Sequence, residues 1–310
     1  MASYKEFHKR SIEDRDGFWG EQAQLIHWNK RPTKTYDFSN PPFVKWFVGG
    51  ETNLCYNAVD RHAETHPDRK ALVYISTETD EEKTYSFSEL RAEVMRMAAI
   101  YQSLGVKKGD RVLIYMPMIA EACFAMLACA RIGAIHSVVF GGFASHSLAT
   151  RIDDAKPTVI VSADAGMRGG RPVPYKHLLD EAINLAEHKP AKVLMVNRGL
   201  DKAMEVVAGR DEDYATLRAQ HLDAQVPVTW LESSDPSYIL YTSGTTGKPK
   251  GVQRDTGGYA VALAASMKHI YCGNAGETFF STSDIGWVVG HSYIIYGPLI
   301  AGMATVMYEG

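Results

Sequence analysis

The chain has 310 residues, 45% of them hydrophobic, so it is long enough to bury a substantial core in one large or two smaller domains. Its net charge of −3 argues against a nucleic-acid partner, because proteins that bind nucleic acids normally carry a basic excess. Its 4 cysteines include no C-x-x-C pair, so neither a structural zinc site nor a disulfide framework is indicated, and Cys123 and Cys129 are expected in the core.

No targeting or membrane-spanning segment is predicted. Residues 1–19 are polar and lack the apolar stretch of a secretory signal. The longest apolar run, 288–308, is interrupted by Gly297, Pro298 and Gly302, a pattern that predicts a helix, a turn and a strand in a soluble core. We therefore expect a cytoplasmic protein without a membrane partner.

Residues 1–55 differ in pattern from the rest of the chain. They hold three of the 5 tryptophans, at Trp19, Trp28 and Trp46, and show little hydrophobic periodicity. This composition predicts an irregular, aromatic-rich N-terminal cap that packs on a larger body and is not an independent domain.

From residue 56 onward the sequence alternates between helical and strand patterns. Apolar runs predict strands at 71–76, 83–87, 111–116, 135–140, 158–163, 192–197, 237–243 and 277–282, of which the first two form a hairpin. Helices are predicted at 56–66, 86–104, 119–133, 145–155, 175–188 and 257–270, with a polar surface excursion at 200–236. Near-continuous apolar strands between helices indicate an α/β fold over 56–310, with a mostly parallel sheet covered by helices on both faces.

Three loops rich in glycine or hydroxyl residues follow predicted strands, at 140–146, 162–176 and 241–251. Ligands of open α/β sheets gather at the carboxyl ends of the strands, so these loops predict a nucleotide or phosphate site. The third loop, "YTSGTTGKPKG", is not a Walker loop, because Thr242 stands where that motif needs glycine and Pro249 follows Lys248. No two glycines lie two residues apart, which excludes G-x-G-x-x-G as well.

What remains at 241–251 is a strand-end loop of hydroxyls, backbone N–H groups and the cations Lys248 and Lys250, all of which suit phosphate. A polar surface hairpin is the alternative. The order of the residues closely resembles the signature loop of the acyl-adenylate-forming enzymes, in which it contacts the β- and γ-phosphates of ATP. The resemblance implies ATP-phosphate contacts for Thr242, Ser243, Gly244, Thr245, Thr246, Gly247 and Lys248.

The stretch 140–176, "FGGFASHSLATRIDDAKPTVIVSADAGMRGGRPVPYK", resembles the short-chain acyl-CoA synthetases that act on acetate and propionate. The resemblance assigns coenzyme A phosphate contacts to Arg168 and Arg171, with Gly141 and Gly142 as weaker candidates. Two guanidiniums around a Gly-Gly hinge are chemically suited to grip a phosphate, although a solvated basic loop is the alternative.

The stretch 283–299, "SDIGWVVGHSYIIYGPL", resembles the acyl-pocket segment of the same enzymes, which implies that Trp287, Val288 and Val289 line the pocket and that Asp284 belongs to the family pattern. Acetate enzymes typically carry threonine at the position of Val289, so valine favours propionate by roughly 1 kcal/mol, the contribution of one methylene. His136 and His291 are expected to be structural, because no Ser/His/Asp constellation accompanies them.

The resemblance covers essentially all of the chain and implies ATP-dependent ligation of a short-chain carboxylate to coenzyme A, with Mg²⁺ and ATP. The expected intermediate is an acyl-adenylate, and AMP and pyrophosphate are released. We expect no catalytic or metal-ligating residue here, because the catalytic lysine and the small C-terminal domain of the family would lie beyond Gly310. On this view the chain is inactive alone; the alternatives are an acetate–CoA ligase or a non-catalytic nucleotide- or coenzyme-binding fragment.

Overall fold

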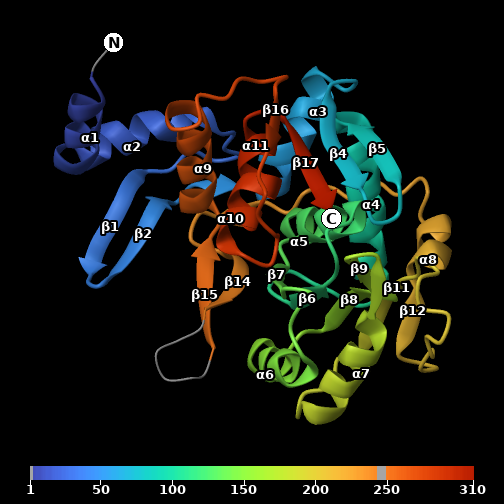
Figure 1. The fold of residues 1–310 in the computed structure, drawn as a ribbon. Helices are drawn as coiled ribbons and strands as arrows, with labels where there is room; N and C mark the ends of the chain where they lie inside the picture. The colour runs from blue at the N-terminus through green and yellow to red at the C-terminus, as the bar shows by residue number, and fades with distance from the viewer. Residues whose placement is uncertain (1–2, 243–248) are drawn as a thin grey trace.

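The computed structural model describes residues 3–242 and 249–310, and its largest element is a seven-stranded sheet (Figure 1). The strand order is β12-β11-β8-β6-β7-β14-β15. The strands are β6 (Arg111–Tyr115), β7 (Ile135–Val138), β8 (Val159–Ala163), β11 (Lys192–Val196), β12 (Asp211–Asp213), β14 (Pro236–Thr242) and β15 (Lys250–Asp255). All neighbours run parallel except β14 and β15, so the predicted, mostly parallel sheet is confirmed.

Helices cover both faces of this sheet, as predicted. Helices α6 (Ser145–Ala155) and α7 (Tyr175–Leu185) lie on one face, and α5 (Ala120–Ile132) lies on the other. Strand β6 shows why: Leu113 and Tyr115 are buried in the smaller core beside α6 and α7, while Val112 and Ile114 are buried in the larger core with α5. Successive side chains of a strand point to opposite faces, so both faces need an apolar cover.

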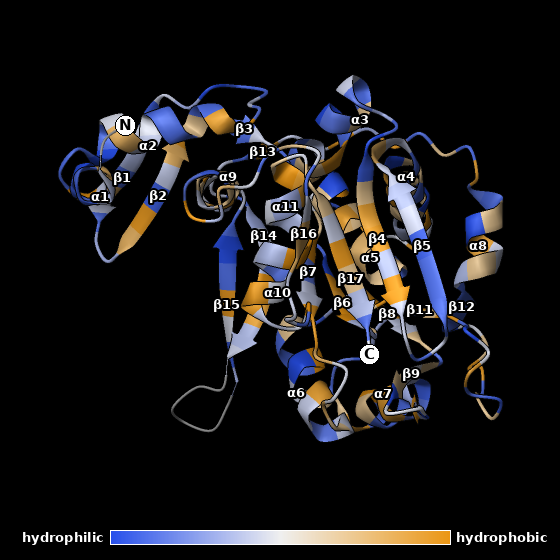
Figure 2. Ribbon diagram, turned by 45° about the horizontal axis from the view of Figure 1, so that its top comes forward, coloured by the Kyte–Doolittle hydropathy of each residue, from blue (hydrophilic) through white to orange (hydrophobic). Residues whose placement is uncertain are grey.

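A second, four-stranded sheet has the order β16-β17-β4-β5. The predicted hairpin is confirmed as β4 (Lys70–Ser76) and β5 (Glu81–Ser86), but two later strands, β16 (Thr278–Phe280) and β17 (Ala304–Glu309), extend it in parallel. Helix α4 (Phe87–Ser103) packs on both this hairpin and α5, so these two helices lie between the sheets. In Figure 2, hydrophobic residues gather on β4, β17 and α5, whereas β5 and β15 are hydrophilic.

The remaining helices follow the predicted pattern with two refinements. Residues 56–66 form the π-helix Tyr56–Asp60 and then α3 (Arg61–Thr65), and 257–270 become α9 (Gly257–His269). The apolar run 288–308 forms α10 (Val288–Gly290), the π-helix His291–Tyr296, α11 (Gly297–Ile300) and β17, as expected for a helix, a turn and a strand. The excursion 200–236 is more regular than predicted, with β12, α8 (Tyr214–Gln220) and β13 (Leu231–Glu232).

The N-terminal cap is also more regular than predicted. It contains α1 (Tyr4–Glu13), α2 (Arg15–Gln22), the hairpin β1 (Lys34–Asn40) with β2 (Phe43–Val48), and the short β3 (Glu51–Thr52). A capping box explains α1, since the Ser3 and Glu6 side chains each accept a backbone N–H bond from the other residue. The aromatic anchoring is confirmed, because Trp19, Trp28 and Trp46 pack against the main core.

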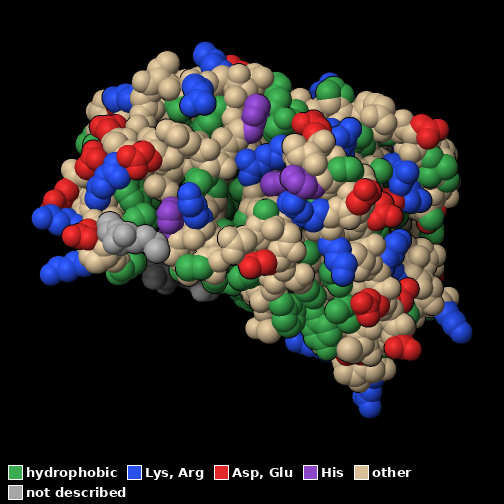
Figure 3. All heavy atoms as spheres, turned by 90° about the horizontal axis from the view of Figure 1, so that it is seen from above, with side chains coloured by type: hydrophobic (Ala, Val, Ile, Leu, Met, Phe, Trp, Pro, Cys, Tyr) green, Lys and Arg blue, Asp and Glu red, His purple; other side chains and the backbone are tan. Residues whose placement is uncertain are grey.

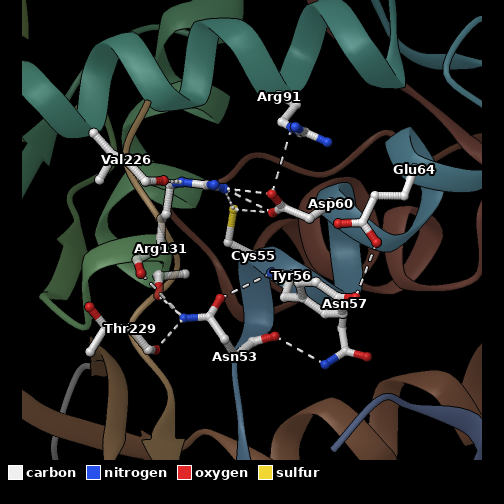
Figure 4. A network of polar contacts seen from close by, with 11 residues as sticks. Asn53, Cys55, Tyr56, Asn57, Asp60, Glu64, Arg91, Arg131, Val226 and Thr229 are labelled. Carbon is white, nitrogen blue, oxygen red and sulfur yellow. Dashed lines mark hydrogen bonds and ion pairs between the residues drawn. The ribbon is translucent and has the colours of Figure 1, made fainter. Parts of the chain in front are cut away.

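A buried polar network joins the end of this cap to the main body (Figure 4). The Arg131 guanidinium of α5 donates to both carboxylate oxygens of Asp60, at 3.0 and 2.8 Å, and to the backbone oxygen of Val226. The Asn53 amide donates to the backbone oxygens of Ala130 and Thr229, at 2.7 and 2.8 Å. Breaking these bonds would leave buried polar groups unpaired, which is costly. The network therefore fixes the end of α5 against residues 53–60 and residues 226–229.

The four cysteines are free, and Cys123 and Cys129 are buried, as predicted. In the described part of the chain, no helix is both long and apolar enough to cross a membrane. On the face seen from above in Figure 3, acidic and basic side chains are interspersed, in keeping with the small net charge of −3.

Candidate functional site

A cavity of about 360 Å³ lies where β6, β7 and β8 end. Its walls are the segments that follow these three strands, the turn between β4 and β5, and two segments from later in the chain. The lining includes Glu78, Phe140, Gly141, Gly142, Arg168, Tyr175 and Asp284. Strands β7 and β8 lie on opposite sides of β6, so the chain reverses its direction across the sheet here. Such a switch point at the carboxyl ends of parallel strands is the usual ligand position in open α/β sheets.

The Gly-Gly turn after β7 approaches aromatic rings too closely for a side chain. A Cβ atom on Gly141 would lie 1.9 Å from the Tyr175 hydroxyl oxygen, and one on Gly142 would lie 2.3 Å from the Phe140 ring. Burial raises the pKa of Tyr175 to about 12, so its hydroxyl stays neutral. Tyr175 stacks on Tyr115 with ring centroids 4.8 Å apart, which gives the turn a rigid aromatic floor.

The two arginines flank a tight hairpin beneath the same cavity. Strands β9 (Ala165–Arg168) and β10 (Arg171–Pro174) pair so that Arg168 faces Arg171 across the turn. The turn residues Gly169 and Gly170 have φ of 57° and 75°, a left-handed conformation that glycine adopts without strain and that suits a two-residue hairpin. Both arginines are exposed, and Arg168 lines the cavity while Arg171 is outside its lining.

Six of the seven residues expected to contact ATP phosphates, 243–248, lie outside the described residues. The seventh, Thr242, ends β14, where it is exposed and faces Lys250 of β15. The preceding residue is firmly anchored, since the Tyr241 hydroxyl donates to Asp154 at 2.6 Å.

Helix α6 connects this strand end to the Gly-Gly turn. The Arg151 guanidinium lies 5.5 Å from the centre of the Tyr241 ring and 4.4 Å from the centre of the Phe143 ring. Cation–π contacts of this kind link the end of β14 to the segment that follows the Gly-Gly turn. Sequence reasoning missed Arg151 and Asp154, because nothing in a helical pattern indicates which distant ring a side chain will meet.

The predicted acyl segment packs on the Gly-Gly turn from the other side. Trp287 lies beside Phe140 and Phe143, with ring centroids 5.6 and 6.3 Å apart. Trp287, Val288 and Val289 are 46%, 45% and 45% exposed, so these predicted pocket residues are open to solvent and are not part of the cavity lining.

Asp284 is the predicted family residue that does enter the cavity. One of its carboxylate oxygens accepts the Gly286 N–H bond at 2.7 Å. Burial nevertheless raises the pKa of this carboxyl group above its ordinary value, because the charged form loses solvent. A half-buried acid with a raised pKa in the lining of a cavity is a common feature of functional sites.

The two histidines are fully buried, as expected for structural residues. His291 Nδ1 lies 3.1 Å from the Trp287 carbonyl oxygen, and His136 Nε2 lies 2.8 Å from the Tyr296 hydroxyl. Burial lowers the pKa of His291 to about 4 and that of His136 well below its usual value, so both rings are neutral near pH 7. A neutral His291 donates from Nδ1 to Trp287 and supports the acyl segment from below.

The chain resembles several known proteins along its whole length. The chain is 65% identical over 308 residues to a propionate–CoA ligase of Salmonella typhimurium, covering 99% of this chain and 49% of that protein. It is 51% identical over 312 residues to the mitochondrial acyl-CoA synthetase short-chain family member 3 of Rattus norvegicus, covering 100% of this chain and 45% of that protein. The chain thus spans about half the length of the relatives it matches.

An acetoacetyl-CoA synthetase structure from Streptomyces lividans superimposes with a TM-score of 0.90 and 28% identity, covering 100% of this chain and 47% of that one. Residues 4–58 match the family described as acetyl-coenzyme A synthetase N-terminus, and residues 59–310 match the family described as AMP-binding enzyme. The chain therefore belongs to the AMP-binding enzyme family.

Proposed function

We propose that the protein joins propionate to coenzyme A through an acyl-adenylate, consuming ATP and releasing AMP and pyrophosphate. The observation that carries the proposal is one cavity at the switch point of the sheet, lined by the Gly-Gly turn, by Arg168 of the hairpin and by Asp284 of the acyl segment. Trp287 of the same segment packs against the Gly-Gly turn outside the cavity lining. The family match and the propionate–CoA ligase relatives support the same chemistry. A cytoplasmic location stays a prediction, since the animal relatives are named mitochondrial.

The reaction needs an activated carboxylate, because oxide is too poor a leaving group for direct attack by a thiol. Transfer of AMP supplies a better leaving group, and the thiol of coenzyme A then displaces AMP. In this proposal the loop 242–248 holds the ATP phosphates, and Trp287 and Val289 line the position of the acyl chain. Arg168 and Arg171 hold the coenzyme. Each group thereby acts by positioning its substrate beside the next.

Magnesium is implied by the family as the companion of ATP. In the described ranges 3–242 and 249–310, no group of three or more His, Cys, Asp or Glu residues could hold a metal ion. These residues therefore form no protein cage for Mg²⁺, which commonly binds through substrate phosphates and only one or two carboxylates.

The direct test is carboxylate-dependent release of pyrophosphate. We would join this chain to the remaining half of the Salmonella relative, so that the protein has the full length of its family, and compare acetate, propionate and butyrate. Propionate should give the highest kcat/KM and require both ATP and coenzyme A for acyl-CoA formation. A tenfold preference for acetate, or ATP hydrolysis without any carboxylate, would contradict the proposal.

The substitution Val289→Thr should shift this preference toward acetate by about 3- to 10-fold, because it replaces a methyl group of the proposed pocket by a hydroxyl. The measurement is the ratio of kcat/KM for propionate and acetate in the same full-length protein. Val207→Thr serves as the matched control, since Val207 is an exposed valine in a distant loop. An unchanged ratio in Val289→Thr would remove Val289 from the acyl pocket.

A further inference from the structure

The tip of the arginine hairpin already holds an anion, which comes from the other sheet. The Gly169 N–H donates to Oε1 of Glu78 at 3.0 Å, and the Gly170 N–H donates to Oε2 of the same side chain at 2.7 Å. Glu78 lies in the turn between β4 and β5, so it reaches the hairpin across the cavity from the second sheet. One carboxylate thus occupies both donors of the turn.

These two N–H groups form a typical anion-binding arrangement. Successive N–H groups of a turn with left-handed residues point to the same side and make a concave donor pair for carboxylate or phosphate oxygens. A Cβ atom on either glycine would meet nothing within 4 Å, so the space beside the turn is open. On the Cβ side of the turn, no neighbouring atom would obstruct a larger anion.

The neighbouring cations are not committed to Glu78. Among the described residues, neither the Arg168 nor the Arg171 guanidinium has a carboxylate oxygen within 4.0 Å. By contrast, Glu309, which lines the same cavity, is fully engaged by Arg198 through two bonds of 2.7 Å. In the part of the chain that the structure describes, the hairpin therefore presents two guanidiniums without a carboxylate partner. They lie beside the Gly169 and Gly170 N–H groups, which the Glu78 carboxylate occupies.

We propose that Glu78 is an affinity-determining residue that competes with a phosphate group of coenzyme A for the N–H groups of Gly169 and Gly170. The proposal rests on the proposed function of the hairpin. In the ligand-free protein the carboxylate satisfies the two donors and keeps the turn ordered. When the coenzyme binds, a phosphate oxygen takes its place, Glu78 returns to solvent, and the arginines pair with the incoming charge.

The first test is calorimetry on the 310-residue chain with Glu78→Gln. A neutral amide competes more weakly for the donors and repels no phosphate, so the affinity for coenzyme A should rise about 3- to 10-fold, the range expected for one hydrogen bond. Glu82→Gln is the matched control, because it removes the same charge from an exposed position of β5. It should leave the affinity unchanged.

Three further ligands identify the phosphate concerned and separate the two proposals. Dephospho-coenzyme A lacks the 3′-phosphate, pantetheine lacks every phosphate, and pyrophosphate lacks the rest of the coenzyme. The increase in affinity caused by Glu78→Gln should disappear with pantetheine. With dephospho-coenzyme A, the increase should persist only if the diphosphate is the group that binds at the turn. One outcome is that neither the unmodified chain nor the Glu78→Gln variant binds coenzyme A, while the variant still binds pyrophosphate more tightly than the unmodified chain. In that case the proposed function fails, and the competition between Glu78 and phosphate at the turn stands.

Backbone amide shifts provide a second readout that a merely structural role would not produce. The Gly169 and Gly170 resonances should move when Glu78 is replaced, and added pyrophosphate should shift the same two resonances in the unmodified chain. Equal or weaker binding of coenzyme A and pyrophosphate by Glu78→Gln would overturn the proposal, since Glu78 would then only hold the turn in shape.

Discussion

Replacing Arg131 with methionine should lower the free energy of unfolding by about 3–5 kcal/mol, because it leaves the buried Asp60 carboxylate without its main partner. The Arg131 side chain is 2% exposed and that of Asp60 is 6% exposed, so water cannot replace the lost bonds. The Val226 oxygen also loses its donor. The measurement is urea unfolding of the 310-residue chain, followed by tryptophan fluorescence.

Two further variants make this result interpretable. The double variant Arg131→Met/Asp60→Leu removes both charges and should recover much of the loss, because an uncompensated charge is the costly element and not the absence of the pair itself. Arg10→Met removes an arginine from the exposed pair with Glu21 and should leave the stability nearly unchanged, because solvent screens exposed ion pairs. A loss below 1 kcal/mol for Arg131→Met would show that the network contributes little.

The double substitution Arg168→Ala/Arg171→Ala should weaken the binding of coenzyme A by a factor of about 100, since each charge-assisted hydrogen bond is worth at least about 1.5 kcal/mol. Binding of pantetheine should not change, because it carries no phosphate. The measurement is calorimetry on the 310-residue chain. The hairpin itself should persist, since its turn depends on the two glycines between the arginines.

Matched variants separate specific contacts from the loss of positive charge. Lys5→Ala/Lys9→Ala removes two charges from exposed positions on α1 and should leave binding unchanged. Arg168→Lys/Arg171→Lys keeps the charge but loses the bidentate geometry, so an intermediate affinity is expected. Equal affinities of the unmodified chain and the double alanine variant would exclude the hairpin from the coenzyme site.

The sequence predicted those parts of the fold whose signal is local. Helix α6 begins and ends at the predicted residues 145 and 155, and the Ser86–Glu89 spacing correctly marked the start of α4, where the Glu89 carboxylate accepts the Ser86 N–H bond at 2.8 Å. Periodicity and capping depend on residues three or four apart, so they can be recognised in the sequence without knowledge of the fold.

The second sheet was missed because its pairing is not local. The β4–β5 hairpin was predicted, but its partner β17 lies more than two hundred residues later, and no pattern in either strand names the other. The site shows the same limit. Arg168, Gly141 and Gly142 could be proposed from their motifs. By contrast, Tyr175, Arg151 and Glu78 become relevant only when folding brings separate elements together.

The distant pairing of β17 with β4 has a consequence for how the protein is made. Ribosomes add roughly 5–20 residues per second, so β4 emerges roughly ten to fifty seconds before its neighbour in the sheet. During that interval the edge of β4 that will receive β17 has no backbone partner and is open to pairing with other chains. The charged residues of β5, on the opposite side of β4, do not protect that edge. Folding in the cell therefore has a vulnerable period that the finished structure conceals.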